Sequence, residues 1–247
     1  MGNKINRIIN SIATSSALML IAISILSAPT VFAGNGAINI NNKINDNTTI
    51  NQPKSKEESQ NVHQELLRTI DDLRVAVPSS AISNKSAADL WFMKGVSYTA
   101  LNKYDMAIKS FDNSIKLDPE NLEACNNKAH VLNQQYKYTE AIEVSDIVIK
   151  KDKSSTNAYI NKGFGLLGLK EYNLAVDEFD KARKLDKDNI NPYVGLAKTY
   201  SGLKKHKKAI EIYDDLICVA ISEDMANTLL QLKNEELRKL QDNGSMK

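Results

Sequence analysis

The sequence predicts an all-α fold, a solenoid of repeated helix pairs, and three observations lead to it. A pattern of residues returns at intervals of about 34 residues, most visibly in the series Ala107, Ala141, Ala175 and Ala209. Each interval holds two apolar stripes at helical spacing with a short polar break between them. The 247 residues include only 10 Gly and 5 Pro and are 6% aromatic, a composition that favours helices.

The first unit, 88–121, illustrates how one helix pair is built. The first apolar stripe contains Trp91, Tyr98 and Leu101, and the second contains Ala107, Ile108, Phe111 and Ile115. Asn102 and Lys103 separate the stripes. Small residues are needed where helix backbones come closest, and Gly95 and Ala107 meet that need. Asp118-Pro119 should end the second helix, because proline disfavours the helical conformation in the residue before it.

Three further units, 122–155, 156–189 and 190–223, repeat these positions in step. The equivalents of Gly95 are Ala129, Gly163 and Ala197; those of Tyr98 are Leu132, Leu166 and Tyr200; those of Tyr104 are Tyr138, Tyr172 and His206; those of Phe111 are Ser145, Phe179 and Tyr213. The aromatic residue at the Phe111 position is therefore missing once, in the second unit, where Ser145 replaces it. Lys153, Lys187 and Ile221 replace the proline in the later turns.

This order of residues resembles the tetratricopeptide-repeat family from Ala88 to about Glu223. The resemblance implies a right-handed α-solenoid of four helix pairs with capping helices at its ends. It also implies a non-catalytic scaffold that binds a peptide segment or helix of a partner protein in a concave groove.

Residues 1–33 have the organisation of a secretory signal peptide. Lys4 and Arg7 precede the apolar run 17–26, and Val31-Phe32-Ala33 forms a cleavage site before Gly34. An uncleaved membrane anchor is the alternative, although Ser24, Ser27 and Pro29 interrupt the run before it reaches the roughly 20 residues of a spanning helix. We expect an exported protein, periplasmic or secreted, or anchored in the inner membrane if the signal is uncleaved.

Residues 34–60 are rich in Asn, Ile and Lys and have no helical period, which predicts a disordered linker. An amphipathic helix should follow at 61–78, because Val62, Leu66, Ile70, Leu73 and Val77 recur three or four residues apart before Pro78. This helix could cap the first repeat, occupy the groove or mediate self-association.

A C-terminal helix is expected at 224–241, with Met225, Leu229, Leu232, Leu237 and Leu240 on its apolar side. Its charged residues, Lys233, Glu235, Glu236, Arg238 and Lys239, suit the solvent-facing side of a cap. The rival interpretation is a helix that builds oligomers by coiled-coil pairing.

Neither the composition nor any motif in the sequence indicates a catalytic, metal-binding or nucleic-acid-binding site. The net charge of +2 includes Lys4 and Arg7, so a chain without its signal is neutral, which argues against a nucleic-acid partner. Cys125 and Cys218 are expected to be buried and too far apart for a disulfide. No metal-ligand spacing, phosphate loop or nucleophile motif is present. We therefore expect no enzyme activity, no cofactor, no metal and no small-molecule substrate.

The family resemblance also implies which side chains line the concave surface. These are Phe92, Met93 and Val96; Asn126, Asn127 and His130; Ile160, Asn161 and Phe164; and Val194, Gly195 and Lys198. Asn127 and Asn161 are equivalent, and an amide can both donate to and accept from a peptide backbone. The apolar members would form pockets for a partner's side chains. An alternative function is structural, with oligomers formed through the terminal helices and the groove unused.

Overall fold

The computed structural model describes residues 84–220 and 222–245, together with eight helical positions nearer the N-terminus (57, 60, 61, 63, 64, 67, 68 and 71). The chain divides into two units, Met1–Val131 and Leu132–Lys247, and each is described by itself. The predicted signal peptide, most of the predicted linker and Pro78 lie outside the described residues.

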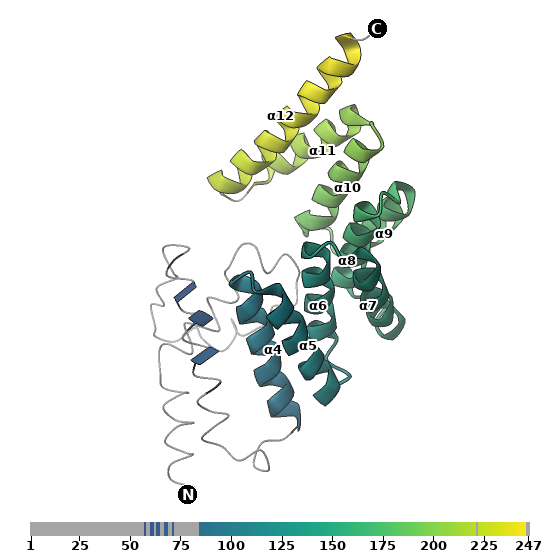
Figure 1. Cartoon of the computed structure of the whole chain (residues 1–247). Coiled ribbons are helices and arrows are strands. Elements are labelled where there is room, and N and C mark those ends of the chain that lie inside the picture. Colours follow the sequence, from purple (N-terminus) through teal and green to yellow (C-terminus); the bar gives the residue numbers. More distant parts are fainter. Residues whose placement is uncertain are drawn as a thin grey trace, which may run out of the picture. The chain divides into compact units, whose positions relative to one another are not determined.

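Residues 84–220 and 222–245 form nine helices and no strand, as predicted for an all-α repeat solenoid (Figure 1). The helices are α4 (Asn84–Ala100), α5 (Tyr104–Leu117), α6 (Leu122–Gln134), α7 (Tyr138–Lys151), α8 (Thr156–Gly168), α9 (Tyr172–Leu185), α10 (Ile190–Gly202), α11 (His206–Cys218) and α12 (Glu223–Ser245).

Two boundaries differ from the sequence prediction. Helix α12 continues to Ser245 rather than ending at 241, whereas α4 begins at Asn84, ahead of the repeat unit that is predicted to start at residue 88. Glu57 and Gln60 are already helical, inside the segment predicted as a linker. Weakly apolar helix ends carry little periodic signal, which explains why the sequence places them only approximately.

The turn within each helix pair has one geometry throughout. Asn102, Tyr136, Lys170 and Lys204 have left-handed φ angles of 57°, 61°, 63° and 58°. In the first of these turns the N–H of Asn102 donates to the Thr99 carbonyl at 2.9 Å, and that of Lys103 donates to the Tyr98 carbonyl at 2.8 Å. The other three turns have the same pair of bonds. This Schellman pattern satisfies the last carbonyls of the first helix and leads the chain into the second.

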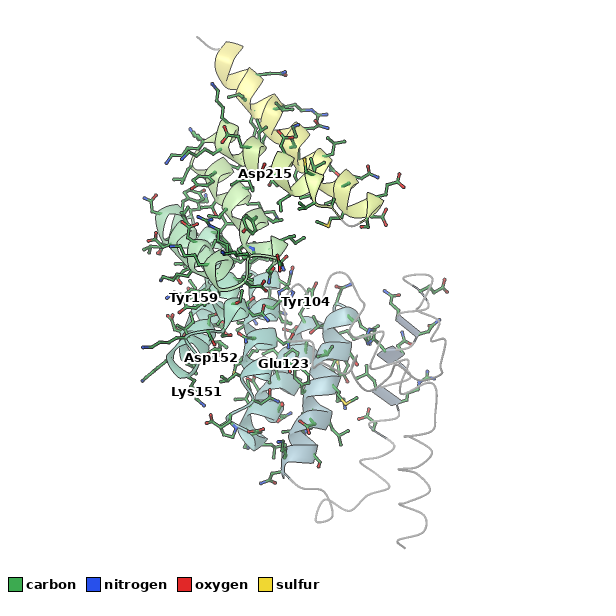
Figure 2. All side chains as sticks on the ribbon, turned by 180° about the vertical axis from the view of Figure 1, so that it is seen from behind. Tyr104, Glu123, Lys151, Asp152, Tyr159 and Asp215 are labelled. Atoms are coloured by element: carbon green, nitrogen blue, oxygen red, sulfur yellow. The ribbon has the colours of Figure 1, made fainter. Side chains whose placement is uncertain are left out.

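The second helices α5, α7 and α9 each end at an aspartate with extended backbone: Asp118, Asp152 and Asp186. Oδ1 of each accepts a hydrogen bond from the N–H two residues later, at 3.1, 2.8 and 3.2 Å. Hydrogen bonds from the side chain and backbone of Ser154 lower the pKa of Asp152, a residue labelled in Figure 2. Only the first turn contains a proline, so the aspartate is the shared turn signal.

The core of the first unit lies between α4 and α5. Val96, Tyr98 and Phe111 are buried in one cluster, which also includes Leu67 from the N-terminal helical positions. A Cβ atom at Gly95 would lie 2.5 Å from Cε1 of Phe111, so the helices approach this closely only because residue 95 is glycine. Leu67, one of the described positions of the predicted N-terminal helix, therefore covers part of this core.

In residues 132–247 the helices pack in series, with α10 contacting α8, α9 and α11. Phe179 of α9 is fully buried, and its ring faces two glycines, Gly163 of α8 and Gly195 of α10. The rings of Tyr138 and Tyr172 lie against Gly168 and Gly202 in the helix pair that follows each of them. The glycines thus provide the space for aromatic contacts between successive pairs.

Ion pairs also repeat between successive helix pairs. Lys128 of α6 bonds Asp112 of α5 at 2.6 Å, and the equivalent Lys162 of α8 bonds Asp146 of α7 at 2.7 Å. Lys94, which precedes Lys128 in this series, is buried and bonds Asp71 at 2.5 Å. Asp71 thus contributes to the first helix pair the contact that Asp112 and Asp146 contribute to the later ones.

Helix α12 packs on α11 in the manner of a further first helix (Figure 1). Lys233 bonds Asp214 at 2.5 Å, and Asp214 is the equivalent of Asp112 and Asp146. Leu229 is buried against a cluster that includes Tyr213 and Leu216. The helix therefore covers apolar residues of α11.

Candidate functional site

The predicted lining residues of α4 divide between the core and the surface. Val96 is fully buried, and the rings of Phe92 and Phe111 have centroids 6.0 Å apart. Phe92 is half-buried and packs against the core cluster of its own helix pair. Met93 is also half-buried.

On α6 the three predicted residues Asn126, Asn127 and His130 are all half-buried. The side-chain N–H of Asn127 donates to the Glu123 carbonyl at 3.0 Å, one turn earlier in the same helix. Burial lowers the pKa of His130 and raises the pKa of Glu123, whose side chain is labelled in Figure 2. At neutral pH His130 is therefore an uncharged ring that can both donate and accept a hydrogen bond.

On α8 two of the predicted residues are core residues. Ile160 and Asn161 are 5% and 6% exposed, and the Asn161 carbonyl accepts a hydrogen bond from Nδ2 of Asn133 at 2.8 Å. Phe164 is half-buried, with its ring edge-on to that of Phe179 at 5.1 Å. The amides of Asn127 and Asn161 are equivalent in sequence, yet only that of Asn127 lies partly at the surface.

On α10 the predicted lining includes one charged group. Lys198 is exposed and Val194 half-buried, whereas Gly195 is buried against Phe179. Because α8 and α10 contact each other, Phe164, Val194 and Lys198 come from adjacent helices. Phe164 and Val194 each pack against a core cluster and leave part of the side chain exposed, and Lys198 adds a charge on the same helix as Val194.

One polar cluster differs from the sequence prediction. Glu236 is expected to face solvent, but it is buried, and its Oε2 lies 2.7 Å from Nδ1 of His206, which is also buried. Ser201 and Lys239 donate to the other oxygen of Glu236, at 2.7 and 2.6 Å. The sequence does contain a signal for this contact, since His206 and Glu236 are equivalent to Tyr172 and Gly202, a contact pair in the preceding unit.

The hydrogen bonds of this polar cluster explain the pKa of Glu236. Burial by itself would raise it, but hydrogen bonds from Lys239, His206 and Ser201 outweigh burial, and the pKa lies below its ordinary value. Burial, together with the charges of Glu236 and Glu235, raises the pKa of Tyr213 to about 12. The cluster fixes α12 on α10 and α11.

The two cysteines have different surroundings. Cys125 is buried as predicted, but Cys218 is exposed, contrary to the prediction. Cys218 is the last residue of α11, so the helix leaves its side chain at the surface. Among the described residues, no group of three His, Cys, Asp or Glu side chains could hold a metal ion, and no helix is long and apolar enough to cross a bilayer.

Comparisons with known proteins agree with this geometry. The family model described as "Tetratricopeptide repeat" matches residues 88–121, and a second model with the same description matches residues 190–217. These are the first and fourth predicted units. No curated protein matches the sequence.

Two solved structures share the fold at low identity. TTC0263, described as a thermophilic TPR protein in Thermus thermophilus, is 16% identical, with a TM-score of 0.56 over 62% of this chain and 88% of that one. MamA from Desulfovibrio magneticus RS-1 is 21% identical, with a TM-score of 0.51 over 74% of this chain and 98% of that one.

The repeated turns, the glycine contacts of the aromatic rings and the two family-model matches all support one assignment. The chain contains tetratricopeptide repeats, matched at residues 88–121 and 190–217.

Proposed function

We propose that this protein is a non-catalytic scaffold whose first helices bind a peptide segment or helix of a partner protein. The observation that carries the proposal is the surface of α8 and α10, where Phe164 and Val194 are half-buried beside exposed Lys198. Half-buried apolar groups beside a cation suit an amphipathic protein segment better than a small polar substrate. Met93, Asn127 and His130 provide comparable partly exposed groups in the first unit.

The burial of Asn161 decides how the proposal should be tested. Replacing both Asn127 and Asn161 by Ala is the test that the sequence suggests, but Asn161 is a core residue whose loss could simply weaken the fold. Photocrosslinking from surface positions avoids this problem. A benzoylphenylalanine side chain at position 93 or 198 lies on the proposed surface. At position 106 or 147 it lies on a second helix, at residues that are 46% and 54% exposed.

In extracts of the native cell, variants labelled at 93 and 198 should each crosslink a partner protein, and variants labelled at 106 and 147, the second-helix controls in the same two units, 1–131 and 132–247, should not. Replacing Asn127 by Ala should reduce the crosslink from 93. Crosslinks of equal yield from all four positions, or none from 93 and 198, would reject the concave surface as the binding site.

We also propose that the protein is exported through residues 1–33, with cleavage after Ala33. The support is the charge, apolar run and small residues of this segment in the sequence. The intact mass of the native protein tests it, since a chain that starts at Gly34 supports cleavage and a full-length chain in the membrane fraction supports the anchor.

A further inference from the structure

The turns within the helix pairs of residues 132–247 form one edge of this unit. Tyr136, Lys170 and Lys204 are equivalent, with left-handed φ angles and the same two backbone hydrogen bonds. Because the backbone geometry is shared, their side chains leave the edge in equivalent directions. Packed helices lie about 8–10 Å apart, so neighbouring turns lie side by side. We call residues 135–140, 169–174 and 203–208 the turn edge.

The turn edge is strongly basic in a protein that is almost neutral overall. Its exposed charges are six lysines and two glutamates: Lys137, Lys170, Lys204, Lys205, Lys207, Lys208, Glu140 and Glu171. No acidic residue occurs in the sequence between Asp188 and Glu211. In the part of the chain that the structure describes, the four lysines of 204–208 form no ion pair, and Lys208 lies 5.4 Å from the Tyr200 ring centroid.

This charge opposes the stability of α11. Lys207 and Lys208 occupy its first turn, where the helix dipole disfavours cations by about 0.3–1 kcal/mol each. The first turns of α5 and α7 instead carry Asp105 and Glu140. The Tyr200 ring partly offsets this cost for Lys208, but Lys207 forms no ion pair among the described residues. A local arrangement that weakens its own helix in this way points to a functional surface.

Apolar side chains accompany the lysines on the same edge. Tyr136, Leu169 and Leu174 are 78%, 41% and 52% exposed. Tyrosine and lysine both combine an apolar body with a polar end, which suits the boundary between lipid headgroups and acyl chains. Exposed leucines gain nothing from the phosphodiester backbone of a nucleic acid, and an edge of projecting turns offers no groove for a peptide.

We propose that the turn edge binds the headgroup surface of an anionic lipid bilayer. The lysines would neutralise lipid phosphates, while Tyr136, Leu169 and Leu174 enter the interface. This attachment is peripheral and independent of the segment 1–33, and it does not depend on peptide binding by the first helices. It would leave the concave surface free for a protein partner.

Vesicle co-sedimentation of the full-length chain tests the proposal. Vesicles of phosphatidylglycerol and phosphatidylcholine in equal parts should bind the protein, in a salt-sensitive way, more tightly than vesicles of phosphatidylcholine alone. Replacing Lys204, Lys205, Lys207 and Lys208 by Gln should weaken the binding to the anionic vesicles about fivefold per lysine, a cumulative loss of several hundredfold. The matched control replaces Lys150, Lys153, Lys184 and Lys187, exposed lysines of the opposite edge, and should bind like wild type.

A local probe separates the turn edge from any contribution of residues 1–33. An environment-sensitive fluorophore on a cysteine at position 136, with Cys218 replaced by Ser, should increase in emission with anionic vesicles. The emission of the same fluorophore at position 153 should not change when anionic vesicles are added. Equal loss in the two lysine variants, no preference for anionic vesicles, or a silent probe at 136 would overturn the proposal. Binding to heparin but not to vesicles would also overturn it, in favour of a soluble polyanion.

Discussion

Lys170 has a backbone conformation that costs a residue other than glycine about 1–2 kcal/mol. Its φ of 63° is imposed by the turn and by the two hydrogen bonds that close it. The side chain is exposed and belongs to no core cluster. At Lys170 the geometry of the repeat therefore imposes a left-handed backbone conformation that lysine does not favour.

Replacing Lys170 by Gly should relieve this strain and raise the free energy of unfolding by about 0.5–1 kcal/mol, after the entropy that glycine adds to the unfolded chain. Thermal unfolding followed by circular dichroism measures the change. The matched control is Lys109→Gly, in the interior of α5, which should lower stability by about 0.8–1 kcal/mol. Destabilisation by both changes would contradict the turn geometry.

A second prediction at the residue scale concerns Glu236. Its carboxylate accepts three hydrogen bonds in a buried site, so Glu236→Gln should lower stability by about 1–3 kcal/mol at neutral pH. Glu235→Gln, at the exposed neighbouring position, should have little effect.

The pH dependence of this loss follows from the lowered pKa of Glu236. A carboxyl whose pKa is lower in the folded state contributes stability that is complete above the unfolded-state value, and that is lost as the pH falls through the folded value. The difference between wild type and Glu236→Gln should therefore persist down to about pH 5 and disappear in stronger acid. A difference that grows with acidity would contradict this assignment.

At the scale of helices, the glycine contacts of Phe179 are the strongest constraint. Its ring fits between α8 and α10 because Gly163 and Gly195 have no side chains. Gly195→Ala should lower stability by about 1–3 kcal/mol, because the new methyl group meets the ring, although alanine is the better helix former.

The same substitution in a Phe179→Leu background should be neutral or stabilising, since a smaller side chain leaves room for the methyl group. Denaturant titrations of the four proteins form a double-mutant cycle. Additive effects of the two changes would mean that Phe179 and residue 195 are not in contact.

Helix α12 shows why its charged residues are hard to assign from the sequence. Glu235, Arg238 and Lys239 are exposed as predicted, but Glu236 is buried and Lys233 pairs with Asp214. Its remaining exposed positions are mainly polar, apart from Leu230. A polar outer face suits a cap, and gives no specific support to oligomers formed through this helix.

For the molecule as a whole, the 34-residue period is sufficient to predict the fold. Ala107, Ala141, Ala175 and Ala209 are all fully buried, as a shared helix-packing position requires. The equivalents of Tyr98 are also buried or packed on core clusters. The 34-residue period and the residue size at each position are visible in the sequence because equivalent positions pack in the same way in every repeat.

The surface is less predictable, because it depends on which side of a helix the neighbouring helices cover. Asn161 is predicted to face a ligand and is buried, and Cys218 is predicted to be buried and is exposed. The net charge of the chain conceals the basic turn edge. Local charge becomes visible only when equivalent turns are compared.

The helix pairs of residues 132–247 stack in series, and nuclear magnetic resonance can test this stacking directly. The rings of Tyr138 and Tyr172 should give nuclear Overhauser contacts to the Hα protons of Gly168 and Gly202, and should shift those protons from random-coil positions. We predict contacts for both residue pairs, Tyr138 with Gly168 and Tyr172 with Gly202, which lie one repeat apart. Unshifted glycine signals without contacts to either ring would contradict the stacked arrangement.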